Sequence, residues 1–530
     1  MKALAQIPFQ NLESIPTLVK DFLNAKIEET QSLVWNHENI KNKIESKTLG
    51  FSPYNREILS EVLCDQHQDL SLSALQKENL DRLSNKNTLT ITTGHQLNLF
   101  SGPVFFIYKI AQVIKSTNEL NKIHPNHHFV PLFWMATEDH DFEEINHFKA
   151  EGEVFSIREE SGGAVGRIQV SDLDFIQNFE NSFKDRKFGG DLIDLMKSSY
   201  KEGETLTQAT RKLVHQLFSE YGLLMIDGDD KRLKALMKET FQKELTENLL
   251  YKSTQKTILD LKQHYGKVQV NPREINLFYL EKTRNRIEFD GEKFVVVDTS
   301  LQFSKEEILN ELKNNPEKFS PNAVLRPVFQ EIILPNLAYI GGNAEIAYWL
   351  ELIECFKSIN LDFPILVPRN SLLFLSEKTL GKMQKLGLSI EEVLGNKQTA
   401  IKTKLLSNHP LESLISEKEN ELKTIFQELK FQSIHTDFSF GQLINAEEMR
   451  QMKSYDRMKK RLLKAEKIKQ QEKVSRIENV FSEVHPAGIW QERVWNFSEF
   501  YADYGSEWLQ DCYNNISIEK SELNVVVYSF

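Results

Sequence analysis

Two stretches of the chain combine an apolar, strand-like run with glycine and hydrogen-bonding side chains directly after it. The first, Thr92 to Pro103, reads TTGHQLNLFSGP, and the second, Phe133 to His147, reads FWMATEDHDFEEINH. Parallel α/β sheets bind small molecules where their strands end, so polar clusters after two strands predict a ligand site. We therefore expect an enzyme or a ligand-binding protein.

A cluster of acids with a histidine follows the second apolar run. Acidic side chains directly after a buried strand are costly unless they are paired or face a cleft. Carboxylates that lie close together push their pKa values apart, which suits a general base or a site for an ammonium group. A solvated helix start, favoured by the helix dipole, is the alternative. The predicted catalytic residues are Glu138, Asp139, His140 and Asp141.

A divalent metal site is a further alternative for this cluster. On a helix, Glu143 and His147 would share a face, as would His140 and Glu144. His140 and His147 would lie about 10 Å apart by helix rise, so they could not both bind one ion. The segment also lacks the H-E-x-x-H pattern. We predict no metal ligands.

The loop after the first apolar run is the predicted site for an anionic group. Its glycines let the backbone approach a ligand, and the helix expected from Pro103 offers free N–H groups and a positive dipole end. An ordinary strand-to-helix turn is the alternative. The predicted substrate-binding residues here are Gly94, His95, Gln96, Asn98, Ser101 and Gly102.

A third cluster lies further along the chain. A Gly-Gly pair after a strand again builds a helix start that can bind an anion, and arginine binds carboxylate or phosphate with two parallel hydrogen bonds. The alternatives are dipole compensation for the acid and salt bridges for the arginines. With an asparagine from the acidic segment, the predicted substrate-binding residues are Asn146, Arg326, Gly341, Gly342, Glu345 and Arg369.

The elements around these clusters predict an α/β fold with a Rossmann-like parallel sheet. A strand at 88–93, a helix from Pro103 and a strand at 129–137 form a strand–helix–strand unit, which implies a parallel pair. Further strands are expected at 223–226, 338–340 and 363–367, and a hairpin at 153–170 turning at Gly162-Gly163. Alternation over 267–298, with a turn at Asp290-Gly291, predicts an antiparallel inserted domain.

The pattern becomes long, charged and helical after residue 376. Leu411, Ile415, Leu422, Ile425 and Leu429 follow a heptad spacing, so two helices joined by a turn predict an antiparallel hairpin. An intramolecular hairpin and a dimer arm are both open. The predicted segments are a first core part at 1–255, a connecting domain at 256–322, a second core part at 323–378, the arm at 379–485 and a C-terminal segment at 486–530.

The composition limits the class of protein. The chain has 530 residues, 40% hydrophobic and 27% charged, which fits a soluble globular protein of about two to four domains. A net charge of −11 disfavours a dedicated nucleic-acid binder. Cys64, Cys355 and Cys512 form no C-x-x-C pair, and no signal peptide or membrane-spanning run is evident, so we expect the cytoplasm.

Five motifs in this order resemble the bacillithiol-biosynthesis cysteine-adding enzymes, the BshC family: TTGHQLNLFSGPVFFIYKI, PLFWMATEDHDFEEINH, LRPVFQEIILPNLAYIGGNAEIAYWLEL, VPRNS and QERVWNFSEFYADYG. The resemblance implies a ligase that joins cysteine to the amine of glucosaminyl-malate. It also implies a core similar to class I aminoacyl-tRNA synthetases, an inserted connecting domain and a coiled coil that favours homodimers. Many relatives carry Gln where this chain has His95.

The resemblance does not fix the compound that activates the cysteine carboxylate, and it leaves two other functions open. The chain lacks a clear HIGH or KMSKS signature, so no cofactor is fixed, and ATP or another nucleotide is the candidate. The segment from Arg450 to Arg476 is basic, which would suit a non-catalytic nucleotide- or tRNA-binding module, although a solvated coiled-coil face explains it as well. A metal-dependent hydrolase is the third function class.

Overall fold

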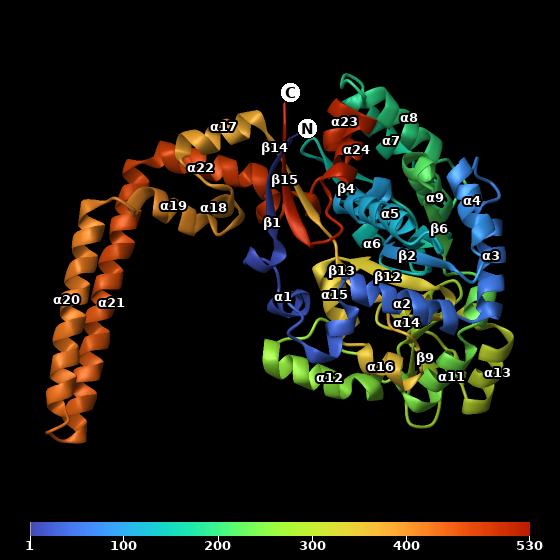
Figure 1. Ribbon diagram of the computed structural model, residues 1–530, viewed down its shortest axis with the longest axis horizontal. Helices are drawn as coiled ribbons and strands as arrows, with labels where there is room; N and C mark the ends of the chain where they lie inside the picture. Colours follow the sequence, from blue (N-terminus) through green and yellow to red (C-terminus); the bar gives the residue numbers. More distant parts are fainter. Residues whose placement is uncertain (1, 530) are drawn as a thin grey trace. The chain divides into compact units, whose positions relative to one another are not determined.

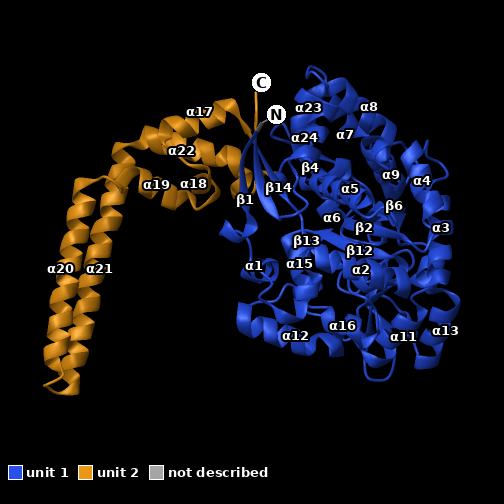
Figure 2. Ribbon diagram, in the orientation of Figure 1, with its two compact units in different colours: residues 1–374, 492–526 blue, residues 375–491, 527–530 orange. Residues whose placement is uncertain are grey.

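The computed structural model describes residues 2–529, and the chain divides into two compact units. The larger comprises residues 1–374 and 492–526, and the smaller comprises residues 375–491 and 527–530 (Figure 2). The finer segment bounds expected within the larger unit stay a prediction. Among the described residues, no helix combines the length and the apolar character needed to cross a membrane.

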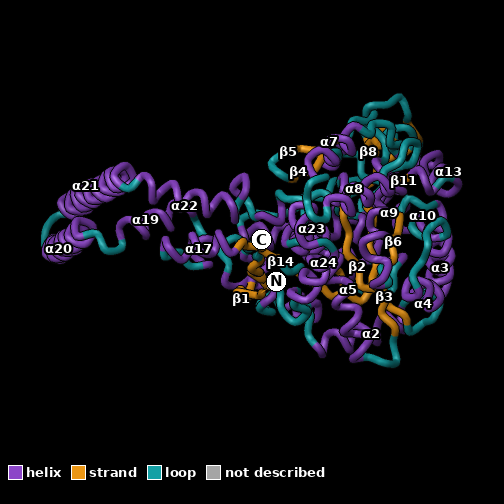
Figure 3. Tube along the Cα trace, turned by 90° about the horizontal axis from the view of Figure 1, so that it is seen from above, coloured by secondary structure: helices purple, strands orange, loops and turns teal. Residues whose placement is uncertain are grey.

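A five-stranded parallel sheet forms the centre of the larger unit. Its order is β13-β12-β2-β3-β6, and every neighbouring pair is parallel (Figures 1 and 3). The strands are β2 (Thr88–His95), β3 (His128–Met135), β6 (Leu224–Asp227), β12 (Asn336–Gly341) and β13 (Ile365–Pro368). Helix α5 (Phe105–Ile123) connects β2 to β3, so the predicted strand–helix–strand unit is confirmed.

Apolar side chains cover both faces of this sheet. On β3, Phe129 belongs to a core cluster with Val113 of α5 and Ile40 of α2 (His37–Gly50). Its neighbour Val130 belongs to a second cluster with Leu59 of α3 (Pro53–His67). Successive strand residues point to opposite faces, so a strand buried on both sides reads as a continuous apolar run.

Other helices surround the sheet. They are α1 (Thr17–Leu23), α4 (Ala74–Arg82), α6 (Phe142–Ile145), α7 (Asp174–Phe183), α8 (Gly189–Ser199), α9 (Leu206–Phe218), α10 (Lys231–Ala235), α11 (Lys238–Glu247), α12 (Leu249–Tyr265), α13 (Lys305–Asn314), α14 (Arg326–Ile333), α15 (Asn343–Leu350), α16 (Ile353–Ser358), α23 (Ser498–Tyr504) and α24 (Ser506–Asn515).

Three further sheets complete the fold. An antiparallel sheet of order β10-β9-β8-β7-β11 confirms the β character expected near 267–298. Its strands are β7 (Leu277–Leu280), β8 (Arg284–Phe289), β9 (Phe294–Val296), β10 (Gln302–Phe303) and β11 (Phe319–Pro321). The other two sheets are β1 (Lys2–Pro8) with β15 (Glu522–Tyr528) and β14 (Ser371–Ser376), and the hairpin β4 (His147–Ala150) with β5 (Glu153–Ser156).

The predicted hairpin at 153–170 was wrong in position. The observed hairpin turns at Glu151-Gly152, where both residues have positive φ, and Gly162-Gly163 lies in a loop. Gly163 is needed there for another reason, because a Cβ atom at this position would lie 2.6 Å from the carbonyl oxygen of Lys282. Glycine pairs mark close backbone approaches as well as turns.

The smaller unit contains the predicted antiparallel helical hairpin. Helices α20 (Pro410–Ser433) and α21 (Phe438–Lys469) pair along their lengths, and Lys430 forms an ion pair with Glu448. The second arm is not continuous, because a break at Gln470 separates α21 from α22. The remaining helices are α17 (Glu377–Leu386), α18 (Ile390–Leu394), α19 (Lys397–Leu406) and α22 (Gln471–Val484).

A buried ion pair ties α2 to α14 beneath the parallel sheet. The Lys47 ammonium lies 2.9 Å from a Glu331 carboxylate oxygen, and the side chains are 4% and 0% exposed. Asn336 and Gln330 donate hydrogen bonds to the other oxygen of Glu331. Burial raises the pKa of Glu331, so the carboxylate depends on these partners.

We predict that Lys47→Met lowers the free energy of unfolding by about 3 to 5 kcal/mol, because it leaves a buried carboxylate without its cation. Denaturant unfolding measures the change. Lys122→Met is the matched control, since Lys122 is 68% exposed in its pair with Glu119 and such pairs contribute at most about 1 kcal/mol. Equal losses in the two variants would contradict the assignment.

Candidate active site

A pocket of about 350 Å³ opens where β2, β3 and β12 end. The loops after β2 and β3 contribute one part of its wall, and α14, α15 and the antiparallel sheet contribute the rest. Seven of the predicted site residues line it: Gly94, His95, Gln96, Glu138, Asp139, Arg326 and Glu345. Trp134, Arg284, Tyr339 and Tyr348 also line it and were not predicted.

His95 is a neutral hydrogen-bond donor in the pocket wall. Its Nδ1 accepts from the Gln96 backbone N–H at 2.8 Å, which assigns the proton of the neutral ring to Nε2. Burial, and then the charges of Lys109 and Arg369, hold the pKa of His95 well below its usual value. Nε2 is buried and has no hydrogen-bond partner among the described residues, so it can donate to a bound molecule.

Asp139 is held as a carboxylate. Its Oδ2 accepts from Gln96 Nε2 at 2.8 Å, and its Oδ1 accepts from the His140 backbone N–H at 2.8 Å. Burial favours the neutral acid, but hydrogen bonds from His140 and Gln96 and the charge of Arg284 hold the pKa of Asp139 well below its usual range. A group that stays ionised is a weak base and a good partner for an ammonium group.

Arg284 reaches the acidic loop from β8 in the antiparallel sheet. Its guanidinium lies 2.9 Å from His140 Nδ1 and donates to the Ser320 hydroxyl at 2.9 Å and to the Pro321 carbonyl at 2.8 Å. The ring of Phe278 lies 4.0 Å from its charge centre. The contact with His140 links the antiparallel sheet to the acidic loop after β3.

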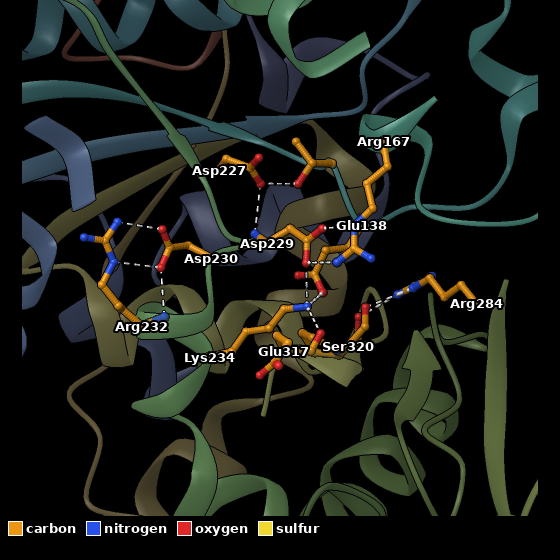
Figure 4. A network of polar contacts seen from close by, with 12 residues as sticks. Glu138, Arg167, Asp227, Asp229, Asp230, Arg232, Lys234, Arg284, Glu317 and Ser320 are labelled. Carbon is orange, nitrogen blue, oxygen red and sulfur yellow. Dashed lines mark hydrogen bonds and ion pairs between the residues drawn. The ribbon is translucent and has the colours of Figure 1, made fainter. Parts of the chain in front are cut away.

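Glu138 belongs to a network of buried charges behind the pocket (Figure 4). One carboxylate oxygen lies 2.7 Å from the Lys234 ammonium, which lies 2.8 Å from Asp229. Arg167 makes two hydrogen bonds to Asp229, at 2.7 and 2.9 Å. The run Asp227-Gly228-Asp229-Asp230 after β6 was the sequence signal for this network, but its partners could not be identified from the sequence.

Asp227 lies at the end of β6 in the same network. The Thr137 hydroxyl and the Asp229 backbone N–H both donate to its Oδ1. Burial, and then the charge of Asp229, raise the pKa of Asp227 to about 6. The carboxyl group therefore changes its protonation within the physiological range.

Arg326 is the cation on the opposite side of the pocket. It extends from α14 between the rings of Trp134 and Tyr339, with its charge centre 5.7 Å from each ring centroid. Its guanidinium donates to the Gln330 side-chain oxygen at 2.9 Å, and no described carboxylate forms an ion pair with it. A half-buried guanidinium without a carboxylate partner favours binding of an anion.

Glu345 lines the pocket, but its oxygens already have partners. Lys109 Nζ lies 2.7 Å from one oxygen and 2.6 Å from the Gly94 carbonyl. The Tyr339 hydroxyl and the Gly342 backbone N–H donate to the other oxygen, at 3.1 and 3.2 Å. Glu345 thus acts as a cap of α15, and Lys109 links the end of β2 to this helix.

Several predicted site residues lie outside the pocket lining. Asp141 accepts from the Glu144 backbone N–H at the start of α6, and Asn146 ends that helix. Arg369 forms a bidentate ion pair with Glu492 at 2.7 and 2.9 Å, and both side chains are at most 4% exposed. Arg369 is therefore a salt-bridge partner, which was the alternative to ligand binding. The others outside the lining are Asn98, Ser101, Gly102, His140, Gly341 and Gly342.

The loop after β2 has a structural role that explains part of its composition. Phe100, Ser101 and Gly102 all have positive φ, and a Cβ atom at Gly102 would lie 2.6 Å from Cβ of Asn98. The Asn496 amide donates to the carbonyls of Phe100 and Gly102, at 2.7 and 2.6 Å. These contacts hold the turn between β2 and α5. Direct ligand contacts by Asn98, Ser101 and Gly102 stay a prediction.

A parallel sheet with a charged pocket at the carboxyl ends of its strands defines a Rossmann-like small-molecule enzyme. The described residues contain no group of three or more His, Cys, Asp or Glu side chains arranged to hold a metal ion. Comparison with known proteins then identifies the family.

Two family profiles match the chain. One is described as "Bacillithiol biosynthesis BshC, N-terminal Rossmann-like domain" and matches residues 3–370, and the other as "Bacillithiol biosynthesis BshC, C-terminal coiled-coil domain" and matches residues 372–528. A Flavobacterium johnsoniae protein named "Putative cysteine ligase BshC" is 42% identical over 509 residues, covering 94% of this chain and 95% of that protein. Proteins of the same name from Christiangramia forsetii and Staphylococcus aureus are 38% and 27% identical, covering 96% and 85% of this chain.

The chain therefore belongs to the BshC family of bacillithiol biosynthesis, and it is a ligase. The resemblance seen in its motifs is confirmed, as is the fold class of a Rossmann-like α/β core with a helical coiled-coil domain. The two other function classes considered from the sequence, a binding module and a hydrolase, have no support in these comparisons.

The raised pKa of Asp227 predicts a pH-dependent stability difference from Asp227→Asn. The ordinary pKa is 3.8 and the folded value about 6, so the folded state binds the proton more tightly. This contribution to stability is complete below about pH 4 and is lost as the pH rises through about 6. Asp227→Asn has no such loss. The free energy of unfolding of the variant, relative to that of wild type, should therefore rise by about 1 to 3 kcal/mol between pH 4 and pH 7.

Denaturant unfolding across this pH range measures the difference. Asparagine keeps an oxygen that accepts from Thr137 and Asp229, so the substitution isolates the charge. Asp194→Asn, at an exposed position on α8, is the control and should follow wild type in parallel. A constant offset between Asp227→Asn and wild type would refute the assignment.

Proposed function

We propose that this ligase forms the amide bond between the carboxyl group of cysteine and the amine of glucosaminyl-malate, the final bond of bacillithiol. The observation that carries the proposal is a single pocket with carboxylates, Glu138 and Asp139, and a cation without a carboxylate partner, Arg326. Such a pocket suits substrates that carry both ammonium and carboxylate groups. The names of the relatives, which refer to cysteine, support the same substrate.

In this proposal the two pocket acids have different roles. Asp139, which stays ionised, binds the ammonium group of cysteine. Glu138 faces the sugar amine and accepts its proton as the amine attacks the cysteine carbonyl carbon. Placing the two reactants in one pocket supplies much of the rate by removing the entropic cost of their encounter.

The opposite side of the pocket would bind the acidic part of the sugar substrate. Arg326 suits a malate carboxylate because its planar guanidinium can make two hydrogen bonds to one carboxylate. The Nε2–H of His95 would donate to a second oxygen. Since His95 is held by a backbone N–H and Arg326 by the ring of Trp134, little entropy is lost when the anion binds.

Activation of the cysteine carboxyl group is part of the proposal. A free carboxylate does not react with an amine to a useful extent, so a co-reactant must convert it to a better acyl donor. We take ATP as the candidate: it would place a phosphate or AMP on the cysteine carboxyl group, and this group would leave as the amide bond forms. Reactions with and without ATP distinguish it from another activator. Because the product is a thiol, we place the reaction in the reducing cytoplasm, where the free thiols of Cys64, Cys355 and Cys512 would persist.

The test is formation of the thiol product from cysteine, glucosaminyl-malate and ATP, followed by mass spectrometry. Glu138→Gln should lower kcat by about 10²- to 10⁴-fold, because it removes the proton acceptor and keeps the shape of the side chain. Glu143→Gln, an exposed acid in the same segment, should retain the wild-type rate. No product above the control without enzyme, or full activity in Glu138→Gln, would refute this proposal.

We also propose that two copies of the chain associate through the helical hairpin. Apolar side chains remain exposed along it, and contiguous exposed apolar surface is typical of an interface. They include Leu411, Leu414, Ile425, Leu429, Phe431, Phe438, Leu443 and Met449, each at least 46% exposed.

Light scattering on the full chain tests this association. Wild type should have twice the chain mass of 61.6 kDa, and Ile425→Glu with Leu429→Glu should yield the single-chain mass. Leu49→Glu, at an 80% exposed position on α2, should leave the mass of wild type unchanged. A wild-type chain that is monomeric at micromolar concentration would contradict this part of the proposal.

A further inference from the structure

Lys234 is a fully buried ammonium group directly behind the pocket. Its side chain is 0% exposed, and its Nζ lies 2.7 Å from Glu138, 2.8 Å from Asp229 and 2.9 Å from the backbone carbonyl of Glu317. Lys234 donates hydrogen bonds to Asp229 and to the Glu317 carbonyl, and its contact with Glu138 is an ion pair. A buried lysine with such partners keeps its charge, and the two carboxylates raise the pKa of Lys234 despite the opposing effect of burial.

The two carboxylates that Lys234 contacts are not equivalent. Asp229 already has a second cation, because Arg167 binds both of its oxygens. For Glu138, Lys234 is the one cation within ion-pair distance among the described residues. Glu138 also lines the pocket, whereas Asp229 and Lys234 do not. Lys234 is therefore the cation that contacts the one carboxylate of this network that lines the pocket.

The segment that carries Lys234 is held firmly in place. Asp230 caps α10 by accepting from the Arg232 backbone N–H at 2.8 Å. A Cβ atom at Gly228 would lie 2.8 Å from the ring of Trp134, so the loop after β6 packs directly on a side chain of the pocket wall. Figure 4 shows the Lys234 ammonium between the carboxylates of Glu138 and Asp229, which come from the loops after two adjacent strands.

We propose that Lys234 is a positioning residue, which fixes the carboxylate of Glu138 at the pocket wall in the orientation that accepts the proton of the attacking amine. This inference rests on the proposed function. A glutamate has three rotatable side-chain bonds, and without its buried partner the carboxylate would turn toward solvent or toward Arg284. A displacement of about 1 Å at a reacting group can lower the rate about 100-fold.

Kinetics and crystallography of Lys234→Met test the proposal. The variant should lower kcat about 10- to 100-fold and leave KM for glucosaminyl-malate within about twofold, because Arg326 is untouched. The same substitution added to Glu138→Gln should cause no further loss, since Lys234 acts through Glu138. If Lys234 only stabilised the fold, Lys234→Met would lower the melting temperature, and it would lower the rate by the same factor in the wild-type and the Glu138→Gln backgrounds. That result would overturn the proposal.

Two further variants keep the test decisive. Lys231→Met is the control, because Lys231 lies on the same helix, is 61% exposed and pairs with the side chain of Glu317; it should match wild type. Should Lys234→Met fail to fold, Lys234→Met with Asp229→Asn replaces it, since this pair of substitutions removes one charge of each sign from the buried network.

The crystal structure of the folded variant separates this proposal from the proposed function. A displaced Glu138 carboxylate supports the positioning role even if wild type makes no cysteine-containing product, which would refute only the reaction. A Glu138 carboxylate in its wild-type place, together with wild-type kinetics, would overturn the role of Lys234 while leaving the reaction intact.

Discussion

Compensation of buried charge at the ends of the parallel strands is the constraint on which this site depends. An ion removed from water is stable only beside an opposite charge or a full set of hydrogen bonds. Lys234 meets this requirement through Glu138 and Asp229, and Lys109 meets it through Glu345 and a backbone carbonyl. These pairs bring the loops after different strands to fixed distances and so define the pocket.

The same constraint indicates where a substrate would bind. Arg284 and Arg326 both line the pocket without an ion pair to a described carboxylate, but Arg284 is held by Ser320, His140 and the Pro321 carbonyl, and the Nε2 of buried His95 lacks any described hydrogen-bond partner. Glu138 and Asp139 reach the pocket from the opposite side. A substrate with an amine and a carboxylate would complete these interactions, which links the charge distribution to the proposed amide synthesis.

Local patterns predicted the parallel core well. Apolar, β-branched runs at 88–93 and 129–137, with a helix from Pro103 between them, correspond to β2, β3 and α5, because a strand buried on both faces has a distinctive sequence. The hairpin expected at Gly162-Gly163 was wrong, because glycine there serves a close backbone contact. The break at Gln470 was missed, because both helices flanking it continue the same charged, amphipathic pattern.

The site could be predicted where its residues directly follow strands of the parallel sheet. It could not be predicted where they come from other parts of the chain. Gln96, Glu138 and Asp139 follow adjacent strands, so their convergence on one pocket followed from the sheet. Arg284 comes from the antiparallel insertion, and Lys234 comes from a short helix after β6. Their contacts with His140 and Glu138 span 144 and 96 residues, and no local pattern records such pairings. Arg369 was expected at the ligand, but it pairs with Glu492, which lies 123 residues further along the chain.

The most direct test of the central claim is a crystal structure of the protein with cysteine and glucosaminyl-malate. The account predicts both molecules in the pocket between β2, β3 and β12, with the sugar amine about 3 Å from the free oxygen of Glu138 and a malate carboxylate on Arg326. Substrates bound elsewhere, with this pocket occupied only by water, would contradict it.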